Sequence, residues 1–178
     1  DLDPLAVDMA LRSGADASLH RHDDPVQSIV QSLSGGHGAD AVIITAGTSS
    51  NDPIELAGQI TRERGRVVIV GAAPMNIPRG PYYMKEIEIR ISRSYGPGRY
   101  DKDYEEEGLD YPIGYVRWTE NRNMQAFQDL LQSGRVDVSY LTTHTFPIAE
   151  APSAYEMLLE KREPFAGILI EYDPGKGP

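Results

Sequence analysis

Two aspartates, Asp1 and Asp3, precede the first predicted helix, which begins at Pro4. A carboxylate at the carboxyl edge of an open α/β sheet can accept both hydroxyl groups of a ribose. Aspartates in this position can instead cap a helix and stabilise its dipole, and the local pattern supports both interpretations. Asp3 is the better cap because it directly precedes the helix, so Asp1 is the candidate ribose ligand.

Small residues follow two apolar runs of the sequence, 41–45 and 66–70. Turns without bulky side chains let the backbone approach a flat ligand at the edge of a sheet. Ordinary turn chemistry would explain either turn alone, but two such turns together favour a nucleotide site. The candidate cofactor-binding residues in these turns are Thr45, Gly47, Val70, Gly71 and Ala72.

Other residues with catalytic or metal-binding chemistry have simpler interpretations. His20 and His22 have no third ligand nearby in the sequence, so a pair on a surface turn is favoured over a metal site. Tyr82 and Lys85 are three residues apart, whereas the Tyr-Lys pair of short-chain dehydrogenases needs a spacing of four. Since Pro81 also argues against a helix there, we expect both residues in an exposed loop.

The acidic residues between Asp101 and Glu107 lack the glycine and the ligand spacing of a calcium-binding EF-hand, so a solvated loop is expected. His144 precedes Phe146-Pro147 and is interpreted as structural or interfacial rather than as a lone catalytic base. The sequence also has no cysteine for a thiolate site. We therefore expect neither a metal site nor a catalytic residue within this chain.

Capping signals and apolar spacing predict the elements that position these residues. The predicted helices run from Pro4 to Gly14, from about Pro25 to Gly35, from Asn51 to Gly65, from about Asn121 to Gln132, and from about Ala149 to Glu160. The predicted strands cover residues 41–45, 66–70, 87–91 and 166–171. The stretch 95–118 is rich in tyrosine, glycine and proline and is predicted to be a long ordered excursion.

The runs 42–45 and 67–70 are apolar without alternation and are joined by one predicted helix. Such strands are typical of a parallel sheet that helices cover on both faces. The fold class is therefore α/β. We expect a three-layer arrangement in which these two are adjacent central strands.

Ile87, Ile89 and Ile91 alternate with charged and polar residues, as in a strand near the edge of a sheet. The backbone groups of such a strand can pair with the same segment of a second chain across a two-fold axis. We therefore expect a homodimer through Ile87 to Ile91. The alternative is a strand that packs only within its own chain.

Composition and charge exclude several classes of partner. The net charge of -10 and the pI near 4.8 would repel a phosphate backbone, so we expect no nucleic-acid partner. No apolar run approaches the ~18 residues of a membrane-spanning helix, so we expect no membrane partner.

The lack of cysteine fits a reducing, cytoplasmic location. The chain begins with Asp1 and not with Met, so we expect a fragment.

Several motifs resemble those of one enzyme family. They are Gly14-Ala15-Asp16, Gly35-Gly36-His37-Gly38-Ala39-Asp40-Ala41-Val42, Gly47, Gly65-Arg66-Val67-Val68-Ile69-Val70-Gly71, and the stretches 130–136 and 143–148. In this order they resemble the cofactor domain and the tail of medium-chain, zinc-type alcohol dehydrogenases. The stretches 94–100 and 110–122 resemble a narrower group, the bacterial two-domain oxidoreductases.

This resemblance implies a Rossmann-like doubly wound parallel sheet, truncated at its amino-terminal βαβ unit and followed by a carboxyl-terminal extension of helices and strands. Residues 1–94 would form a partial dinucleotide-binding domain. Residues 95–178 would form the extension that completes the dehydrogenase unit. Many members of the family dimerise through the region of 87–91, which agrees with the expected homodimer.

Position by position, the resemblance makes Asp1 the ribose ligand, places Thr45 and Gly47 beside the dinucleotide, and directs the backbone of residues 70–72 at the nicotinamide carboxamide. The implied reaction transfers a hydride between a nicotinamide cofactor and a small-molecule alcohol or carbonyl substrate. A carbohydrate substrate is implied by the narrower group alone. An acidic ribose ligand favours NAD, with NADP as the alternative.

The sequence departs from the family in lacking a Gly-x-Gly-x-x-Gly motif, and no zinc ligands or proton-relay residues can be assigned. The zinc dependence of the intact enzyme is therefore left open, and the fragment alone is expected to be inactive. One alternative is an S-adenosylmethionine-dependent methyltransferase, although its polar-Pro-Pro-aromatic motif is absent after the run 42–45. The other is a non-catalytic nucleotide-binding or oligomerisation module.

Overall fold

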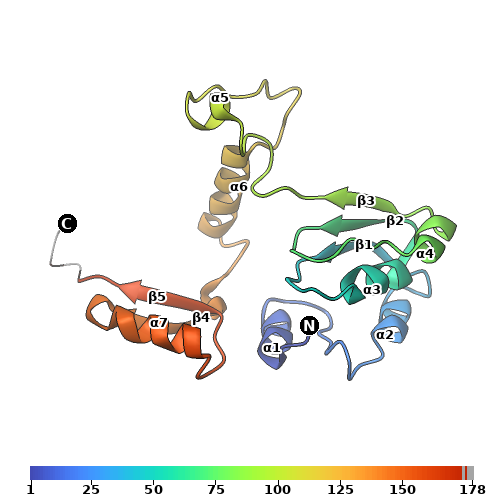
Figure 1. Ribbon diagram of the computed structural model, residues 1–178, viewed down its shortest axis with the longest axis horizontal. Helices are drawn as coiled ribbons and strands as arrows, with labels where there is room; N and C mark the ends of the chain where they lie inside the picture. Colours follow the sequence, from blue (N-terminus) through green and yellow to red (C-terminus); the bar gives the residue numbers. More distant parts are fainter. Residues whose placement is uncertain (174, 176–178) are drawn as a thin grey trace. The chain divides into compact units, whose positions relative to one another are not determined.

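The computed structural model describes residues 1–173 and residue 175, which group into two compact units (Figure 1). One unit contains residues 25–127. The other combines residues 1–24 with the chain from Gln128 onwards. This grouping reflects spatial proximity, and the domain boundary between residues 94 and 95 stays a prediction.

The unit of residues 25–127 is built on a parallel sheet, as predicted (Figure 1). Its strands β1 (Ala39–Ile44), β2 (Thr61–Ile69) and β3 (Glu88–Ile91) follow one another in that order. Both pairings are parallel, with Val42 opposite Val67 and Val67 opposite Ile89. The α/β class and the adjacency of β1 and β2 are therefore confirmed.

The predicted central position of β1 is wrong within this unit. Among the described strands β1 pairs only with β2, and Ile43 is 63% exposed. Helix packing is found on the opposite face, where Ile44 and Val67 join the core. The apolar run predicted a strand covered on both sides, but in this part of the chain a single helical layer covers the sheet.

That helical layer contains α3 (Asp52–Ile60) and α4 (Arg79–Met84), and α2 (Val26–Leu33) packs next to α3 (Figure 1). Ile54 and Ala57 of α3 are 1% and 0% exposed. The helix ends five residues before Gly65, where the sequence predicted its end. Thr61 is already extended, and its hydroxyl donates to the Ala57 carbonyl at 2.7 Å, so the chain enters β2 directly.

The expectation that Tyr82 and Lys85 lie in an exposed loop is wrong. Pro81 is in the first turn of α4, where no intrahelical N–H partner is needed, so the helix tolerates it. Tyr82 is 6% exposed and donates to the Ile54 carbonyl at 2.8 Å. The Lys85 ammonium donates to three carbonyls at the end of α3, those of residues 58, 59 and 61, at 2.7–2.9 Å. Both residues therefore fasten α4 to α3.

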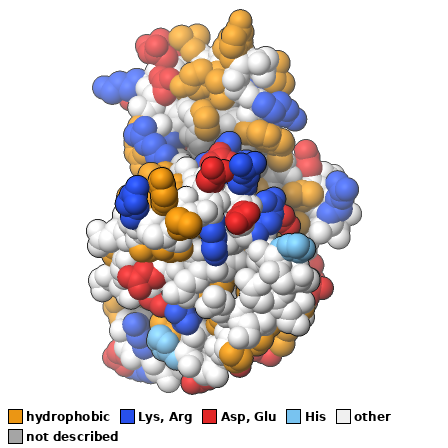
Figure 2. Space-filling model, turned by 90° about the vertical axis from the view of Figure 1, so that its right-hand side faces the viewer, with side chains coloured by type: hydrophobic (Ala, Val, Ile, Leu, Met, Phe, Trp, Pro, Cys, Tyr) orange, Lys and Arg blue, Asp and Glu red, His pale blue; other side chains and the backbone are white. Residues whose placement is uncertain are grey.

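The outward face of the sheet carries a row of ion pairs. Arg66 of β2 lies opposite Glu88 of β3 and donates to its carboxylate at 2.7 Å, and Arg90 donates to the same carboxylate at 2.5 Å. These hydrogen bonds hold the pKa of Glu88 below its usual value. Figure 2 shows basic and acidic side chains beside one another on one face of the molecule.

Residues 95–118 form the ordered excursion that the sequence predicted, with the short helix α5 (Lys102–Glu105). Asp101 caps α5 and accepts a hydrogen bond from the Tyr111 hydroxyl, which lowers the pKa of Asp101. The excursion leads into α6 (Glu120–Gln132). Met124 and Phe127 of α6 are both nearly half exposed.

The other unit contains α1 (Pro4–Arg12), β4 (Thr142–Pro147), α7 (Ala151–Glu160) and β5 (Gly167–Glu171) (Figure 1). Two short 3-10 helices, Ser139–Leu141 and Ile148–Glu150, flank β4. β4 pairs in parallel with β5, and α7 contacts β4. The predicted helix and final strand are confirmed, whereas β4 was not predicted. No helix in the described part of the chain is long and apolar enough to cross a membrane.

We predict that Tyr82 makes the stability of this unit depend on alkaline pH. Burial raises the pKa of Tyr82 to about 12. Because this folded-state value exceeds the ordinary value of 10.0, the contribution is complete below about pH 10 and is lost as the pH rises towards 12. It amounts to about 2 kcal/mol. Urea unfolding from pH 8 to 11.5 should show this loss in the wild type and not in Tyr82→Phe.

The exposed neighbour Tyr83 provides the control. Tyr83→Phe should keep the wild-type loss of stability above pH 10. An equal pH dependence in Tyr82→Phe and the wild type would contradict the assignment.

Candidate functional site

The turns that follow β1 and β2 lie against each other at one edge of the sheet. The backbone N–H groups of Val70 and Gly71 both donate to the Ile44 carbonyl at 2.9 Å, and the Thr48 N–H donates to the Ala72 carbonyl at 3.0 Å. The carboxyl ends of parallel strands meet at such an edge, and open α/β sheets bind ligands there. The structure thus brings together Thr45, Gly47, Val70, Gly71 and Ala72, all predicted from the sequence.

Gly71 is required by the contact between the two turns. A Cβ atom at this position would lie 2.2 Å from the Ala46 carbonyl oxygen and 2.6 Å from that of Thr45. Both obstacles are backbone atoms, so neither can move aside without distorting the turn. Only a glycine lets the two backbones approach this closely.

Gly47 has a different environment. A Cβ atom built there would meet no atom within 4 Å, and its backbone is not in the left-handed region that favours glycine. The fold therefore does not need a glycine at this position. The space beside it is open to a ligand.

The turn after β2 has backbone groups left for a ligand. Among the described residues, the Ala72 N–H and the Val70 carbonyl take part in no backbone hydrogen bond, and both residues are exposed. One is a donor and the other an acceptor, and they are two residues apart in one turn. A planar amide, which has both an acceptor and a donor, is complementary to this pair.

The Asn51 side chain joins the two segments that follow these turns. Its side-chain amide donates to the Asn76 carbonyl at 2.9 Å, and its side-chain oxygen accepts from the Asn76 N–H at 3.2 Å. The sequence pointed to Asn51 only as a helix start, although its side chain does not cap α3. A partner 25 residues away gives no local signal.

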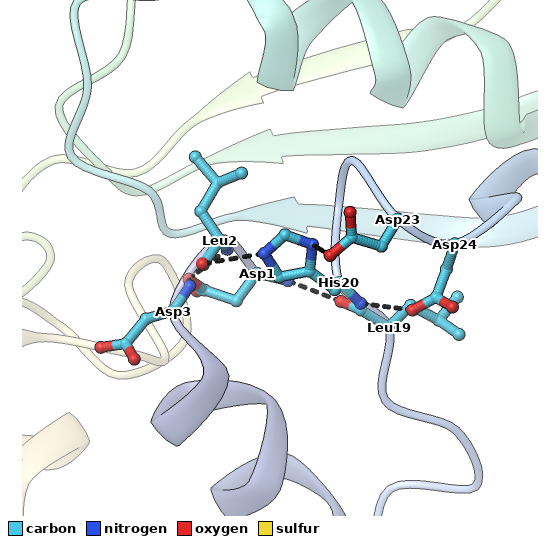
Figure 3. A network of polar contacts seen from close by, with 7 residues as sticks. All are labelled: Asp1, Leu2, Asp3, Leu19, His20, Asp23 and Asp24. Atoms are coloured by element: carbon cyan, nitrogen blue, oxygen red, sulfur yellow. Dashed lines mark hydrogen bonds and ion pairs between the residues drawn. The ribbon is translucent and has the colours of Figure 1, made fainter.

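Asp1 lies in the other unit, and its role as ribose ligand stays a prediction. One carboxylate oxygen accepts from the N–H groups of Leu2 and Asp3 at 2.6 and 3.0 Å (Figure 3). Its backbone nitrogen donates to the Leu19 carbonyl, and its carbonyl accepts from the Arg21 N–H. This alternation is that of a parallel strand pair, so Asp1 belongs to an extended segment beside residues 19–21.

Asp3 is the helix cap, as the sequence predicted. Its carboxylate accepts from the Leu5 N–H at 2.9 Å, and Pro4 occupies the first turn of α1. The two aspartates therefore have separate tasks. Asp3 stabilises the helix, and the Asp1 carboxylate accepts hydrogen bonds from the backbone of the two residues that precede the helix.

A family model for zinc-binding dehydrogenases matches residues 1–109. This chain belongs to the zinc-binding dehydrogenase family. The chain is 23% identical over 167 residues to an alcohol dehydrogenase of Cupriavidus necator, covering 93% of this chain and 39% of that protein. It is 24% identical over 170 residues to an erythritol/L-threitol dehydrogenase of Mycolicibacterium smegmatis, covering 96% and 40%. The chain thus spans about two fifths of the length of these relatives.

Solved structures agree with the fold. An alcohol dehydrogenase from Thermus sp. ATN1 matches with a TM-score of 0.69 at 22% identity, covering 97% of this chain and 42% of that one. An Escherichia coli oxidoreductase/dehydrogenase of unknown specificity matches with a TM-score of 0.71 at 19% identity, with the same coverage. Family membership favours a dehydrogenase over the methyltransferase alternative.

The described residues do not form a zinc site, although the family is a zinc-binding one. In this part of the chain no group of three or more His, Asp or Glu side chains is arranged to hold a metal ion, and the sequence has no cysteine. His144 contacts the Thr143 hydroxyl at 2.9 Å, stacks on Phe146 and lies 3.6 Å from Glu163. These contacts fit the structural role predicted for His144.

A cavity of about 500 Å³ lies between the excursion and the start of α6. Its lining residues are Tyr104, Glu105, Gly108, Asp110, Glu120, Asn121 and Met124. Two of its carboxylates are already paired, Glu105 with Arg99 and Asp110 with Arg122. None of the predicted cofactor-binding residues lines this cavity.

We predict that Gly71→Ala destabilises the protein by about 1 to 3 kcal/mol, because the added methyl group overlaps two carbonyl groups. Gly47→Ala should change the free energy of unfolding by less than about 0.5 kcal/mol, since its methyl group enters open space. Urea unfolding of both variants measures the difference. Equal stability of the two variants would contradict the role of Gly71.

Proposed function

We propose that this chain binds the nicotinamide cofactor of a dehydrogenase that transfers a hydride between NAD and an alcohol or carbonyl substrate. The observation that carries the proposal is the paired turn, in which Gly71 is fixed by the fold and Gly47 borders open space. Membership of the zinc-binding dehydrogenase family supports it. The bound cofactor supplies the hydride chemistry, and the protein binds and orients it.

In this proposal the turn after β2 holds the nicotinamide carboxamide. The Ala72 N–H donates to the carboxamide oxygen, and the Val70 carbonyl accepts from its amino group. The N–H groups of Val70 and Gly71 take no part, because both already donate to the Ile44 carbonyl. Thr45 and Gly47 lie beside the dinucleotide, where a small residue leaves room for its flat surfaces.

Asp1 binds the adenosine ribose through the carboxylate oxygen Oδ2, since Oδ1 is used by two backbone N–H groups. A carboxylate at this position repels the additional phosphate of NADP, so NAD is the favoured cofactor. We assign no catalytic residue to this chain. The substrate class we propose is a polyhydroxylated alcohol, supported by the relative named as an erythritol/L-threitol dehydrogenase.

We also propose a homodimer through Ile87 to Ile91. β3 is an edge strand among the described strands, as predicted, and Ile91 is 66% exposed. On the outward face, Arg66 and Arg90 both pair with the Glu88 carboxylate, so the charge of Glu88 is compensated. An edge strand with unpaired backbone groups is suited to pairing with a second copy.

We predict that Gly47→Val in the intact protein weakens NAD binding at least about tenfold, because the side chain fills the space proposed for the dinucleotide. Calorimetric titration with NAD measures the effect. Gly114→Val is the matched control, since Gly114 also has no atom within 4 Å of an added Cβ. Unchanged NAD affinity in a folded Gly47→Val protein would contradict the site, and saturable binding of S-adenosylmethionine instead of NAD would favour the methyltransferase.

Replacing Asp1 tests the cofactor preference. In the intact protein, Asp1→Ala should weaken NAD binding and narrow its advantage over NADP. Asp3→Ala is the control, because it removes the cap of α1 at a cost of about 1 kcal/mol in stability and should leave the NAD to NADP ratio unchanged. The same ratio in Asp1→Ala and the wild type would count against the ribose assignment.

The dimer is tested best at Ile91, because Ile89 packs against the core and a charge there would also unfold the sheet. Ile91→Lys should convert the dimer to a monomer in sedimentation at several concentrations. Ile113→Lys introduces the same charge at an exposed isoleucine of the excursion and should leave the dimer intact. A monomeric wild type would refute the interface.

A further inference from the structure

The cavity between the excursion and the start of α6 has the size of a small-molecule site. Its volume is about 500 Å³, and ligand pockets in proteins commonly measure about 300–1,000 Å³. One wall comes from within residues 104–110 of the excursion, and the other from within residues 120–124 of α6. Both walls belong to the same compact unit of the chain.

Contacts of Tyr104 hold the walls of this cavity in place. The Tyr104 hydroxyl accepts from the Asn121 backbone N–H at 3.2 Å, so the excursion is joined to α6. The Tyr104 ring stacks on Tyr111, with 5.6 Å between the ring centroids. The chain also passes close to this ring at Gly98, where an added Cβ atom would lie 2.7 Å from two ring atoms. Walls fixed in this way need little ordering when a ligand binds.

Most of the negative charge in the lining is compensated. Glu105 pairs with Arg99, and Asp110 pairs with Arg122. An ionised carboxylate has about four lone-pair sites, so each of the two can still accept hydrogen bonds from a ligand. The paired carboxylates therefore contribute hydrogen-bond acceptors and little net charge.

Two further polar side chains of the lining are free for a ligand. Among the described residues, the side chains of Glu120 and Asn121 take part in no hydrogen bond or ion pair. The Asn121 amide can both donate and accept, and the Glu120 carboxylate accepts. The described lining has no basic side chain, so a phosphate or carboxylate ligand would be repelled.

The lining thus combines many acceptors, one free amide donor and apolar surface. The apolar surface comes from the Tyr104 ring and the Met124 side chain. A polyol or a sugar has the complementary groups, because its hydroxyls donate and accept and its C–H groups are apolar.

We propose that this cavity is a binding site for a neutral polyhydroxylated ligand, a polyol or a sugar. The ligand hydroxyls donate to the carboxylates of the lining and accept from the Asn121 amide. The ligand C–H groups pack against Tyr104 and Met124. The cavity shares no residue with the proposed cofactor site, so the inference goes beyond the proposed function and does not depend on NAD binding.

The test is amide chemical-shift titration of the intact protein with xylitol and with D-glucose, without NAD. At least one of the two should cause saturable shifts at residues 104–110 and 120–124. Because the ligand is neutral, its dissociation constant should change by less than about twofold between about 0.05 and 0.5 M salt.

Asn121→Ala removes the free amide without breaking a side-chain hydrogen bond within the described part of the chain. It should weaken the binding about three- to tenfold, as expected for the loss of one or two hydrogen bonds. Gln125→Ala is the matched control, since it removes an exposed amide from the same helix outside the cavity. It should bind with the wild-type affinity.

Three results would overturn the inference. One is the absence of saturable shifts at the cavity with either probe, and another is an equal loss of affinity in Gln125→Ala and Asn121→Ala. The third is salt-dependent binding of n-butylammonium at these residues without binding of xylitol or D-glucose, which would make the cavity a cation site. Each of these results would leave the proposed cofactor site untouched, because no step of the test uses NAD.

Discussion

The contact between the turns after β1 and β2 is the constraint on which the rest of the candidate site depends. Gly71 brings its backbone against the carbonyl groups of Thr45 and Ala46, and no other residue fits there. Two N–H groups of the second turn are then committed to the Ile44 carbonyl. Among the described residues, the Ala72 N–H and the Val70 carbonyl take part in no backbone hydrogen bond, and the proposal assigns both to the nicotinamide carboxamide.

The helical layer keeps this edge in place. Tyr82 and Lys85 bind carbonyl groups of α3, which packs on β1 and β2, so the strands that carry the turns are held from one face. Asn51, which directly precedes α3, forms two hydrogen bonds with the backbone of Asn76 and so joins the segments that follow the two turns. The packing of α3 on the sheet and the hydrogen bonds between the turns therefore hold the same edge of β1 and β2. The site is part of the core architecture and does not sit on an independent loop.

The sequence predicted β1, β2 and the two turns that follow them, because those depend on local patterns. Apolar runs without alternation gave parallel β1 and β2, and small residues after them marked the two turns. Features that depend on distant partners were missed. Spacing and Pro81 placed Tyr82 in a loop, whereas its burial against Ile54 is decided 28 residues away. Likewise β1 has the composition of a central strand, but composition cannot say which neighbours a strand has.

Amide chemical-shift mapping of the intact protein during titration with NAD tests the central claim most directly. The account predicts that the largest shifts occur at residues 45–47 and 70–72, with the Ala72 amide moving downfield as it donates a new hydrogen bond. The Val70 and Gly71 amides should move less, since their hydrogen bonds to Ile44 are kept. Saturable NAD binding that leaves the Ala72 amide unmoved and instead shifts the residues lining the cavity between the excursion and α6 would contradict it.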